Sequence, residues 1–409
     1  MKILFVNTQM STGGIATSLV NLCENLKKYP DIEVDVLLLN QVNGDTRYNI
    51  SDNIKILNVR NKYLELYTKS LKKISEYSNI VEKLNVLIMK VIRKVLGPEN
   101  IIKLIFKSIP KIYGYDIAIS YRNDEYHKDP YVIYGCNDFV LQCVSSRKKI
   151  AWIHSDLDRN GFTYSICKDK FKEFNYIVNV SAGCKDRFDK IIPEYKDKSK
   201  LVYNTFNYDE IINKSTEFNP YKNIDDNIIK LVTVGRINHE QKRMDRILEV
   251  CNKLREQHIT NYIWYVVGDG PDAYKMQLDI DRLGLNENII LVGKKSNPFP
   301  YMKYADCLVM TSEYEAYGMT LVEALILETP IITTNHIAAE EIVSIGVNGY
   351  ISENSSSGIE EKVKMILENP KKLELLNINI KNQNIDKNIA LNQFLELVDF
   401  NPLNTQYNN

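Results

Sequence analysis

Short apolar runs alternate along this chain with helical patterns, and the alternation occurs in two series. Such alternation is typical of βαβ units, in which a helix connects neighbouring parallel strands. The sequence therefore predicts two α/β domains, with helices of the second domain at 243–255, 271–283 and 320–327. The predicted strands are 3–6, 33–39, 54–59, 116–120, 150–154, 176–180 and 201–204 in the first series, and 229–234, 262–267, 288–292, 305–311 and 330–333 in the second.

A polar stretch that is poor in core residues separates the two series. It includes residues 207–210 and 219–227, and we expect the hinge between the domains there. The 409 residues are enough for each domain to build its own core. We predict domains at 1–206 and 207–384, followed by a helical tail at 385–409. In doubly wound domains, ligands bind beyond the carboxyl ends of the strands.

Composition and charge exclude several classes of protein. The chain is 44% hydrophobic and 25% charged with a formal net charge of zero, so its charge does not indicate a nucleic-acid partner. Its seven cysteines have no metal-binding spacing, which favours reduced, buried thiols in a cytosolic protein. The first apolar run is interpreted as a strand rather than a signal peptide, and no run is long enough to cross a membrane. We expect a cytoplasmic protein.

The most informative segment is 312–325, which follows a strand and begins a helix. Glu315 lies in the strand-to-helix loop, Gly318 at the helix start and Glu323 inside the helix. A helix start attracts phosphate through its free N–H groups and its dipole. Carboxylates on either side could accept hydrogen bonds from a sugar and a ribose, which indicates a sugar-nucleotide site. The alternative is an ordinary amphipathic helix with two solvated glutamates.

This pattern resembles the Glu-x7-Glu motif of retaining glycosyltransferases of family 4, which serve capsular, surface-polysaccharide or lipopolysaccharide synthesis in bacteria. Ala316 and Tyr317 replace the Gly-Phe usual in that motif. The resemblance implies the GT-B fold, an α/β arrangement of two Rossmann-like doubly wound domains facing a central cleft. The N-terminal domain would bind the acceptor and the C-terminal domain the nucleotide sugar. The helical tail would cross back onto the first domain.

Two cations in the second domain match these acids. Arg236 follows the strand 229–234, and Lys242 lies six residues later. A leaving diphosphate needs fixed positive charge, which guanidinium and ammonium groups can supply. The resemblance implies this role for Arg236 and Lys242. The spacing is one residue longer than the common one, so Arg243 remains the alternative partner.

Further donor-site candidates lie in loops and at the helix start. The turn 267–271 resembles the family's Gly-x-Gly-Pro turn and is mainly structural. The resemblance makes Gly293 and Lys294 candidates for holding the base. Gly318, Met319 and Thr320 would face the phosphates, although Thr320 could instead cap the helix.

The first domain contributes one glycine loop and one histidine. Gly13 and Gly14 follow the first strand without forming a dinucleotide GxGxxG fingerprint, and in related enzymes this loop reaches the diphosphate and the sugar. The alternative is a tight turn. His154 ends a strand, and the resemblance places it near the transferred sugar. The four other histidines are interpreted as surface residues: His127, His239, His258 and His336.

The resemblance also implies a mechanism. We expect front-face displacement with retention, in which the leaving phosphate helps to deprotonate the acceptor. Arg236 and Lys242 would stabilise the diphosphate, Glu315 would orient the sugar, Glu323 would bind the ribose and His154 would contact the sugar. No Asp-x-Asp occurs in a site context, so we expect no metal and no cofactor. The donor is expected to be a UDP-sugar.

The acceptor signal is a basic, amphipathic region at 60–112. It holds twelve Lys and Arg against four acids, and apolar residues recur at helical spacing from Leu84 to Val95. Such a helix can lie on an anionic membrane, which would favour a lipid-linked glycan acceptor and a peripheral position on the inner face of the plasma membrane. The alternative is a helix that packs into the core and solvates its basic face.

Two other classes of function remain open. One is a catalytically silent GT-B protein that acts as partner or chaperone of an active transferase; such proteins usually lose a cation or an acid of the set that this chain keeps. The other is a sugar-nucleotide epimerase, which shares the architecture but needs no acceptor.

Overall fold

The computed structural model describes the chain except residues 11–12, 41–53, 70–78, 128–132, 384–385 and 402–409. Thr12 of the glycine loop, part of the basic region (Lys72, Lys73 and Glu76) and residues 385 and 402–409 of the expected tail therefore lie outside the described residues. The chain divides into two compact units, Met1–Phe206 with Asn388–Asn409, and Asn207–Lys387. Among the described residues, no helix combines the length and apolar character needed to cross a lipid bilayer.

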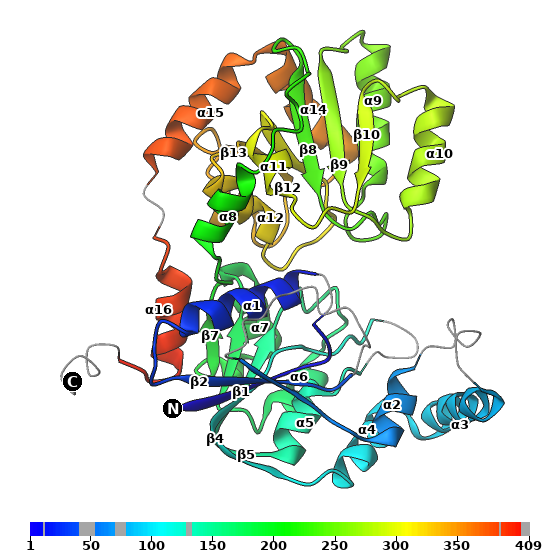
Figure 1. Cartoon of the computed structure of the whole chain (residues 1–409), viewed down its shortest axis with the longest axis vertical. Coiled ribbons are helices and arrows are strands. Elements are labelled where there is room, and N and C mark those ends of the chain that lie inside the picture. The colour runs from blue at the N-terminus through cyan, green and yellow to red at the C-terminus, as the bar shows by residue number, and fades with distance from the viewer. Residues whose placement is uncertain (11–12, 41–53, 70–78, 128–132, 384–385, 402–409) are drawn as a thin grey trace. The chain divides into compact units, whose positions relative to one another are not determined.

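Unit 1 is a seven-stranded parallel sheet with helices packed on it (Figure 1). Its strands follow the order β3-β2-β1-β4-β5-β6-β7. Its elements are β1 Lys2–Asn7, α1 Gly14–Leu26, β2 Glu33–Leu38, β3 Lys55–Asn58, α2 Lys62–Thr68, α3 Ile80–Leu96, α4 Pro98–Lys107, β4 Ile112–Ser120, α5 Cys136–Cys143, β5 Val144–Ile153, α6 Tyr164–Phe171, β6 Tyr176–Asn179, α7 Ala182–Ile191, the 3-10 turn η2 Pro193–Tyr195, β7 Ser199–Leu201 and α16 Ile389–Leu397.

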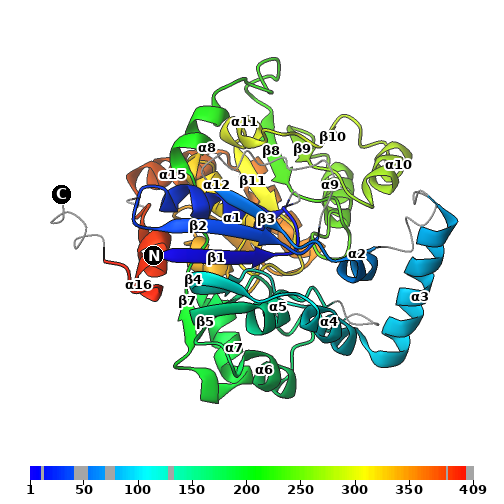
Figure 2. The same cartoon turned by 60° about the horizontal axis from the view of Figure 1, so that its bottom comes forward.

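The final helix α16 belongs to unit 1. The Phe394 ring stacks on Phe5 of β1 at 6.1 Å and on Trp152 of β5 at 6.0 Å between ring centroids. The Gln393 side chain accepts a hydrogen bond from the backbone N–H of Tyr203 at 3.0 Å. Figure 2 shows α16 beside the start of β1. Apolar burial and this hydrogen bond therefore hold α16 on the first unit.

Unit 2 repeats the architecture with six parallel strands in the order β10-β9-β8-β11-β12-β13. Its core is apolar and includes Trp264 of the second strand, which is fully buried. Its elements are α8 Tyr208–Ser215, β8 Ile229–Val234, α9 Asp245–Glu256, β9 Tyr262–Val267, α10 Ala273–Leu283, β10 Ile289–Gly293, α11 Phe299–Lys303, β11 Cys307–Met310, α12 Met319–Ile326, β12 Ile331–Thr334, α13 Ala339–Ile342, β13 Gly349–Ser352, α14 Ser356–Glu368 and α15 Lys371–Asn382.

In each sheet the strand order reverses once. In unit 1 the reversal lies between β1 and β4, and in unit 2 between β8 and β11. The connections that leave the carboxyl ends of these two strands run to opposite sides, so the loops part and leave room for a ligand. The loops after β8 and β11 carry Arg236, Lys242, Glu315 and Gly318. Topology alone therefore gathers these four candidates at one point, whereas Gly293 and Lys294 follow β10.

The bounds of the predicted strands agree with the structure to different degrees. β8 and β9 have the predicted bounds, whereas β4 and β5 begin earlier than predicted. The first residues of β5 are Val144-Ser-Ser-Arg-Lys-Lys, and a polar strand start carries no apolar signal. The short strand β13 was not predicted. It begins at Gly349, where a Cβ would lie 2.3 Å from the Ile331 carbonyl oxygen, so close backbone approach requires glycine there.

The seven cysteines are all free and buried, as expected from their spacing. Burial raises the pKa of the thiols, for example that of Cys143 to about 11. These thiols therefore behave as small apolar core residues.

Candidate functional site

A direct ion pair joins the two loops at the reversal point of unit 2. The Lys242 Nζ atom donates to the Glu315 Oε1 atom at 2.5 Å, and the Ser312 hydroxyl donates to the same oxygen at 2.7 Å. The Glu315 side chain is 10% exposed and that of Lys242 22%. An ion pair in such a position is far less screened than one on the surface. The structure thus brings together one predicted cation and one predicted acid.

The carboxyl groups of this site differ in their ionisation. Burial raises the pKa of Glu315, but Lys242 and the Ser312 hydroxyl outweigh it, so the pKa lies below its ordinary value. Burial raises the pKa of Glu323 to about 8, although Lys242 acts in the opposite direction. No hydrogen bond to the Glu323 carboxyl is present within the described part of the chain. At neutral pH, Glu315 is therefore an acceptor, while Glu323 carries a proton that it can donate.

The helix α12 begins directly after Glu315 and its loop. Gly318 is its N-cap residue at φ 91°, and no side chain caps the first N–H groups. A Cβ at Gly318 would lie 3.1 Å from Leu321, so this position favours glycine for both its conformation and its contacts. Since Gly318 is the cap, the alternative that Thr320 caps the helix is wrong. Met319 and Thr320 form the first turn and are partly exposed.

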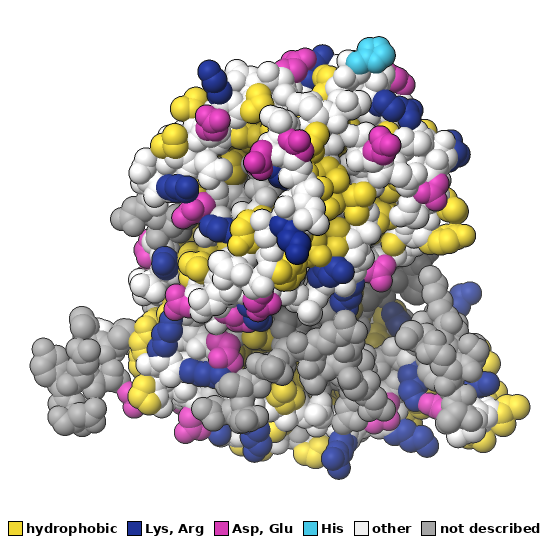
Figure 3. Space-filling model, turned by 45° about the horizontal axis from the view of Figure 1, so that its top comes forward, with side chains coloured by type: hydrophobic (Ala, Val, Ile, Leu, Met, Phe, Trp, Pro, Cys, Tyr) yellow, Lys and Arg dark blue, Asp and Glu magenta, His cyan; other side chains and the backbone are white. Residues whose placement is uncertain are grey.

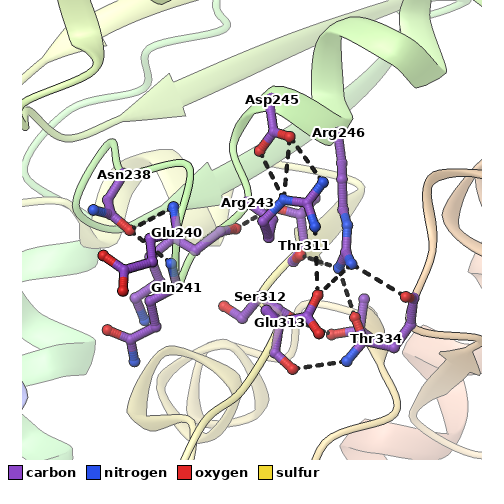
Figure 4. A network of polar contacts seen from close by, with 12 residues as sticks. Asn238, Glu240, Gln241, Arg243, Asp245, Arg246, Thr311, Ser312, Glu313 and Thr334 are labelled. Atoms are coloured by element: carbon purple, nitrogen blue, oxygen red, sulfur yellow. Dashed lines mark hydrogen bonds and ion pairs between the residues drawn. The ribbon is translucent and has the colours of Figure 1, made fainter. Parts of the chain in front are cut away.

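A polar network fixes the loop of Lys242 against the loop of Glu315 (Figure 4). The Arg246 guanidinium donates to Glu313 at 2.6 Å and to the Thr311 carbonyl at 2.9 Å, and its side chain is 3% exposed. The Thr311 hydroxyl donates to the Lys242 carbonyl at 2.8 Å. The Asn354 amide donates to the Glu313 carbonyl at 2.7 Å. These bonds hold the ion pair in a defined geometry.

The same network separates the roles of the two adjacent cations. Arg243 has φ 47° and donates to both carboxylate oxygens of Asp245, with Glu313 at 3.5 Å. Its guanidinium is therefore held by Asp245 and Glu313 within the polar network, as Figure 4 shows. The ammonium group of Lys242 instead contacts Glu315. The geometry favours Lys242 over Arg243 as the cation available to a ligand.

Arg236 lies in a loop that the glycine turn of 268–270 supports. A Cβ at Gly268 would lie 1.8 Å from the Gly235 carbonyl oxygen, and one at Gly270 would lie 2.1 Å from that of Ile237. The Ile237 N–H donates to the Asp269 carbonyl at 3.1 Å. Arg236 itself is exposed, and no described residue forms an ion pair with it. Because Gly268 and Gly270 have no Cβ, the backbone of the turn 268–270 can contact the backbone of the loop that carries Arg236.

The remaining unit 2 candidates lie at the end of β10. Gly293 has φ 76°, and its carbonyl accepts a hydrogen bond from the Gly268 N–H at 3.1 Å. A Cβ at Gly293 would meet open space, and the neighbouring Lys294 is exposed. The loop of Gly293 and Lys294 is therefore tied to the glycine turn that supports Arg236.

In unit 1, Gly13 and Gly14 are exposed at the start of α1, after β1. His154 follows β5, and its ring lies 4.5 Å from that of Tyr121 between centroids. Burial and the nearby Arg122 lower the pKa of His154 to about 3, so the imidazole is neutral. Its Nε2 atom is buried and has no hydrogen-bond partner among the described residues. His154 therefore has a polar atom that a ligand or water could satisfy.

One histidine was assigned wrongly from the sequence. His336 was expected on the surface, but it is 7% exposed and lies two residues beyond β12. Its Cε1 atom would lie 3.6 Å from a Cβ at Gly318. Burial lowers its pKa to about 4, with Glu315 and Lys242 acting in opposite directions. Its place after a strand of the sheet was the signal that could have identified it.

Residues 214–383 match the family model of Glycosyl transferases group 1. The matched residues lie within unit 2. The chain is 27% identical over 251 residues to an uncharacterized glycosyltransferase of Methanocaldococcus jannaschii. This aligned region covers 59% of this chain and 61% of that protein. It is 25% identical over 252 residues to the lipopolysaccharide 1,6-galactosyltransferase of Escherichia coli K12, covering 57% and 64%. The chain thus spans less than two thirds of these relatives.

The two-domain fold is shared over almost the whole chain. The crystal structure of Anabaena HepE in complex with UDP-glucose is 18% identical, has a TM-score of 0.69 and covers 98% of this chain and 100% of that one. This likeness establishes the GT-B fold, with two Rossmann-like parallel-sheet domains. The described residues of unit 2 contain no group of three or more His, Cys, Asp or Glu arranged to hold a metal ion.

Proposed function

We propose that the protein is a retaining glycosyltransferase that moves a hexose from a UDP-sugar to a glycan or lipid-linked glycan in surface polysaccharide synthesis. The observation that carries the proposal is the Lys242–Glu315 ion pair at the uncapped start of α12. It places a cation, an ionised carboxylate and free helix N–H groups within one group 1 domain. This set suits a donor with a diphosphate beside a sugar.

Each residue would have a distinct part in the transfer. Lys242, Arg236 and the N–H groups of Met319 and Thr320 would stabilise the charge that develops on the leaving diphosphate. Glu315, held ionised by Lys242, would accept hydrogen bonds from sugar hydroxyls and orient the ring. Binding of the diphosphate would then place a second anion beside Lys242, so this lysine would be shared between sugar orientation and charge stabilisation.

Glu323 would bind the ribose. Its carboxyl is protonated at neutral pH, because its pKa is about 8, and it can donate one hydrogen bond and accept another. A ribose diol offers both a donor and an acceptor, so a neutral carboxyl satisfies it without placing a second negative charge near the diphosphate. From unit 1, Gly13 and Gly14 would approach the donor, and the free Nε2 of His154 would contact the transferred sugar.

The proposed reaction retains configuration without a metal ion or cofactor. The acceptor hydroxyl attacks the anomeric carbon on the face that the diphosphate leaves, and its proton passes to a phosphate oxygen. The glycosidic bond to UDP breaks as the new bond forms, so the products are UDP and the glycosylated acceptor. The protein supplies position and charge rather than a covalent nucleophile. Activity that survives chelator, and a product with the donor's anomeric configuration by NMR, are the expected results.

The decisive experiment measures release of nucleoside diphosphate with and without acceptor. A transferase releases UDP with acceptor, an epimerase converts the donor without it, and a silent partner does neither. A thermal-shift screen of UDP-, GDP- and ADP-sugars identifies the donor, since ligand at 100 times its Kd stabilises the folded state by about 2.7 kcal/mol. Absence of both stabilisation and turnover with all three nucleotide classes would remove the proposal.

A further inference from the structure

The helix α3 of unit 1 has two faces of opposite character. Its inner face contacts α2 and α4, and Figures 1 and 2 show α3 at the edge of unit 1 beside those helices. Val86 and Met89 are its buried residues. On the same face, the Arg93 guanidinium lies 4.9 Å from the centre of the Tyr67 ring, and Glu82 forms an ion pair with Lys69. The spacing 82, 86, 89 and 93 defines one helical stripe.

The opposite face of α3 is an apolar stripe exposed to solvent. Ile80 is 81% exposed, Val91 63% and Val95 75%, values at which a side chain has hardly any packing partner. The spacing of the stripe follows the helical repeat, so its members form one continuous face. The alternative that these residues pack into a core is therefore wrong. The outer stripe comprises Ile80, Leu84, Leu87, Ile88, Val91 and Val95, each at least 45% exposed.

One edge of the outer stripe carries positive charge. Lys83, Lys90 and Lys94 recur at intervals of seven and four residues, which places them side by side along that edge. The single acid of α3, Glu82, points to the inner face and is paired with Lys69. Figure 3 shows yellow apolar side chains next to dark-blue basic ones at the lower right, where Figure 1 draws α3. Nothing acidic on α3 therefore offsets these lysines.

We infer that the outer stripe of α3 docks on the surface of an anionic lipid bilayer. A contiguous face of six exposed apolar side chains marks an interaction site, whereas single exposed apolar residues do not. The occupant follows from the charges, because a helix with an apolar face and a lysine edge is complementary to acyl chains below anionic headgroups. A second copy of this helix packed antiparallel would instead bring two lysine edges together. The inference extends the proposed function by placing the acceptor-binding unit where lipid-linked glycans reside.

Flotation with liposomes tests the docking without any sugar. The full chain is mixed with phosphatidylcholine vesicles containing or lacking 30% phosphatidylglycerol, and the floated fraction is measured. We expect strong binding to the anionic vesicles and weak binding to the neutral ones, with the difference decreasing at high salt. Equal binding to both, or binding to neither, overturns the inference.

Two variants separate the parts of the surface. Leu84→Ser combined with Ile88→Ser and Val91→Ser should lower the partition coefficient at least ~100-fold, because three inserted side chains are lost. Lys83→Glu, Lys90→Glu and Lys94→Glu together should lower it on the order of 100-fold, about fivefold for each lysine, on anionic vesicles only.

Matched controls come from elsewhere on the chain. Leu375 and Ile378 of α15 are 60% and 55% exposed, so Leu375→Ser with Ile378→Ser tests loss of exposed apolar side chains as such. Lys196, Lys275 and Lys371 are exposed and serve in the same way for charge reversal. Both controls should bind like the parent protein. The substituted apolar side chains, Lys94 and the control residues are exposed, whereas Lys83 and Lys90 are half-buried. Melting temperatures should remain within a few degrees, which is checked by circular dichroism for every variant.

Two further readouts exclude other occupants and separate this inference from the proposed function. Sedimentation without lipid should show the same oligomeric state for the parent and the serine variant. Self-association that the serine variant abolishes would assign the stripe to a second copy and overturn the inference. The serine variant should keep donor stabilisation in the thermal-shift screen. Thus the lipid-binding result tests the docking of α3 independently of the proposed function. Failure of the parent protein to bind a donor would contradict the proposed function without bearing on α3.

Discussion

The Nζ atom of Lys242 lies 2.5 Å from Oε1 of Glu315, a residue 73 positions further along the chain. The two residues leave neighbouring strands, β8 and β11, at the point where the order of the sheet reverses. The contact is poorly screened because both side chains are mostly buried. Lys242 therefore helps to keep the Glu315 carboxyl ionised, and changes at either position should be coupled.

Replacing Lys242 should impair the reaction far more than replacing Arg243. Lys242→Met removes a charge that faces the developing diphosphate, so we expect kcat to fall by about 10²–10³. Arg243→Met removes a group engaged with Asp245, and it should cost less than about tenfold in kcat. Steady-state kinetics of both purified variants provides the comparison. Equal losses would indicate that the two cations share the role.

The Lys242–Glu315 pair should also show energetic coupling. Lys242→Met alone leaves the Glu315 carboxylate buried without its cation and should destabilise unit 2 by ~1–3 kcal/mol. Adding Glu315→Gln removes that uncompensated charge, so the double variant should regain much of the lost stability while remaining inactive. Urea unfolding of the four proteins in this cycle measures the coupling. Strict additivity would contradict direct pairing.

Arg246 should be a structural residue of the site. Arg246→Leu removes the closer of the two guanidinium donors to Glu313 and the donor to the Thr311 carbonyl, and we expect a loss of about 2–4 kcal/mol in the free energy of unfolding. Arg255 lies on the same helix α9 but is exposed, so Arg255→Leu is a matched control with an effect below ~1 kcal/mol. Denaturant titration followed by circular dichroism measures both. Similar losses for the two variants would argue against a scaffold role of Arg246.

Gly268 should control the position of the Arg236 loop. Gly268→Ala would place a methyl group 1.8 Å from the Gly235 carbonyl oxygen, so this loop must move and donor affinity should fall by roughly tenfold or more. Gly346 also has a positive φ, but a Cβ there meets open space. Gly346→Ala therefore carries the backbone strain without the clash and should keep donor affinity. Titration calorimetry with the donor distinguishes the two.

The raised pKa of Glu323 predicts a pH-dependent stability. The folded state holds this proton up to about pH 8, whereas the unfolded chain releases it near the ordinary value of 4.5. Folding therefore binds a proton between these values, and the Glu323 contribution to stability decreases as pH rises from 4.5 to 8. Glu323→Gln stays neutral throughout. It should melt about 2–4 °C above the parent at pH 9, the shift that ~1 kcal/mol produces, and equal the parent near pH 4.

The test for Glu323 is a melting-temperature profile of both proteins from pH 4 to 9. A melting-temperature difference between the two proteins that stays constant from pH 4 to 9 would show that Glu323 does not titrate in this pH range. Donor affinity should follow the same profile, because the neutral carboxyl supplies the hydrogen-bond donor. Glu323→Gln keeps a donor and an acceptor, so it should retain donor binding above pH 8 better than the parent protein does.

Most of the architecture and of the local chemistry could be predicted from the amino-acid sequence. β8 and β9 have the predicted bounds because apolar residues predominate in both strands, and an apolar run is a local property of the sequence. The sequence also predicted an acid, a glycine and a helix start in that order at Glu315 and Gly318, which the loop and α12 reproduce. These features depend on residues that are close together in the chain.

Only the tertiary structure decided how those residues are used. Lys242 and Arg243 are adjacent and carry the same charge, and the left-handed backbone of Arg243 turns one towards Asp245 while the other meets Glu315. The buried place of His336 likewise depends on packing between strands far apart in sequence. In α3 the spacing of the apolar residues would be the same whether the outer stripe faced the core or the solvent. Periodicity is local, whereas burial is set by what the rest of the chain places against a face.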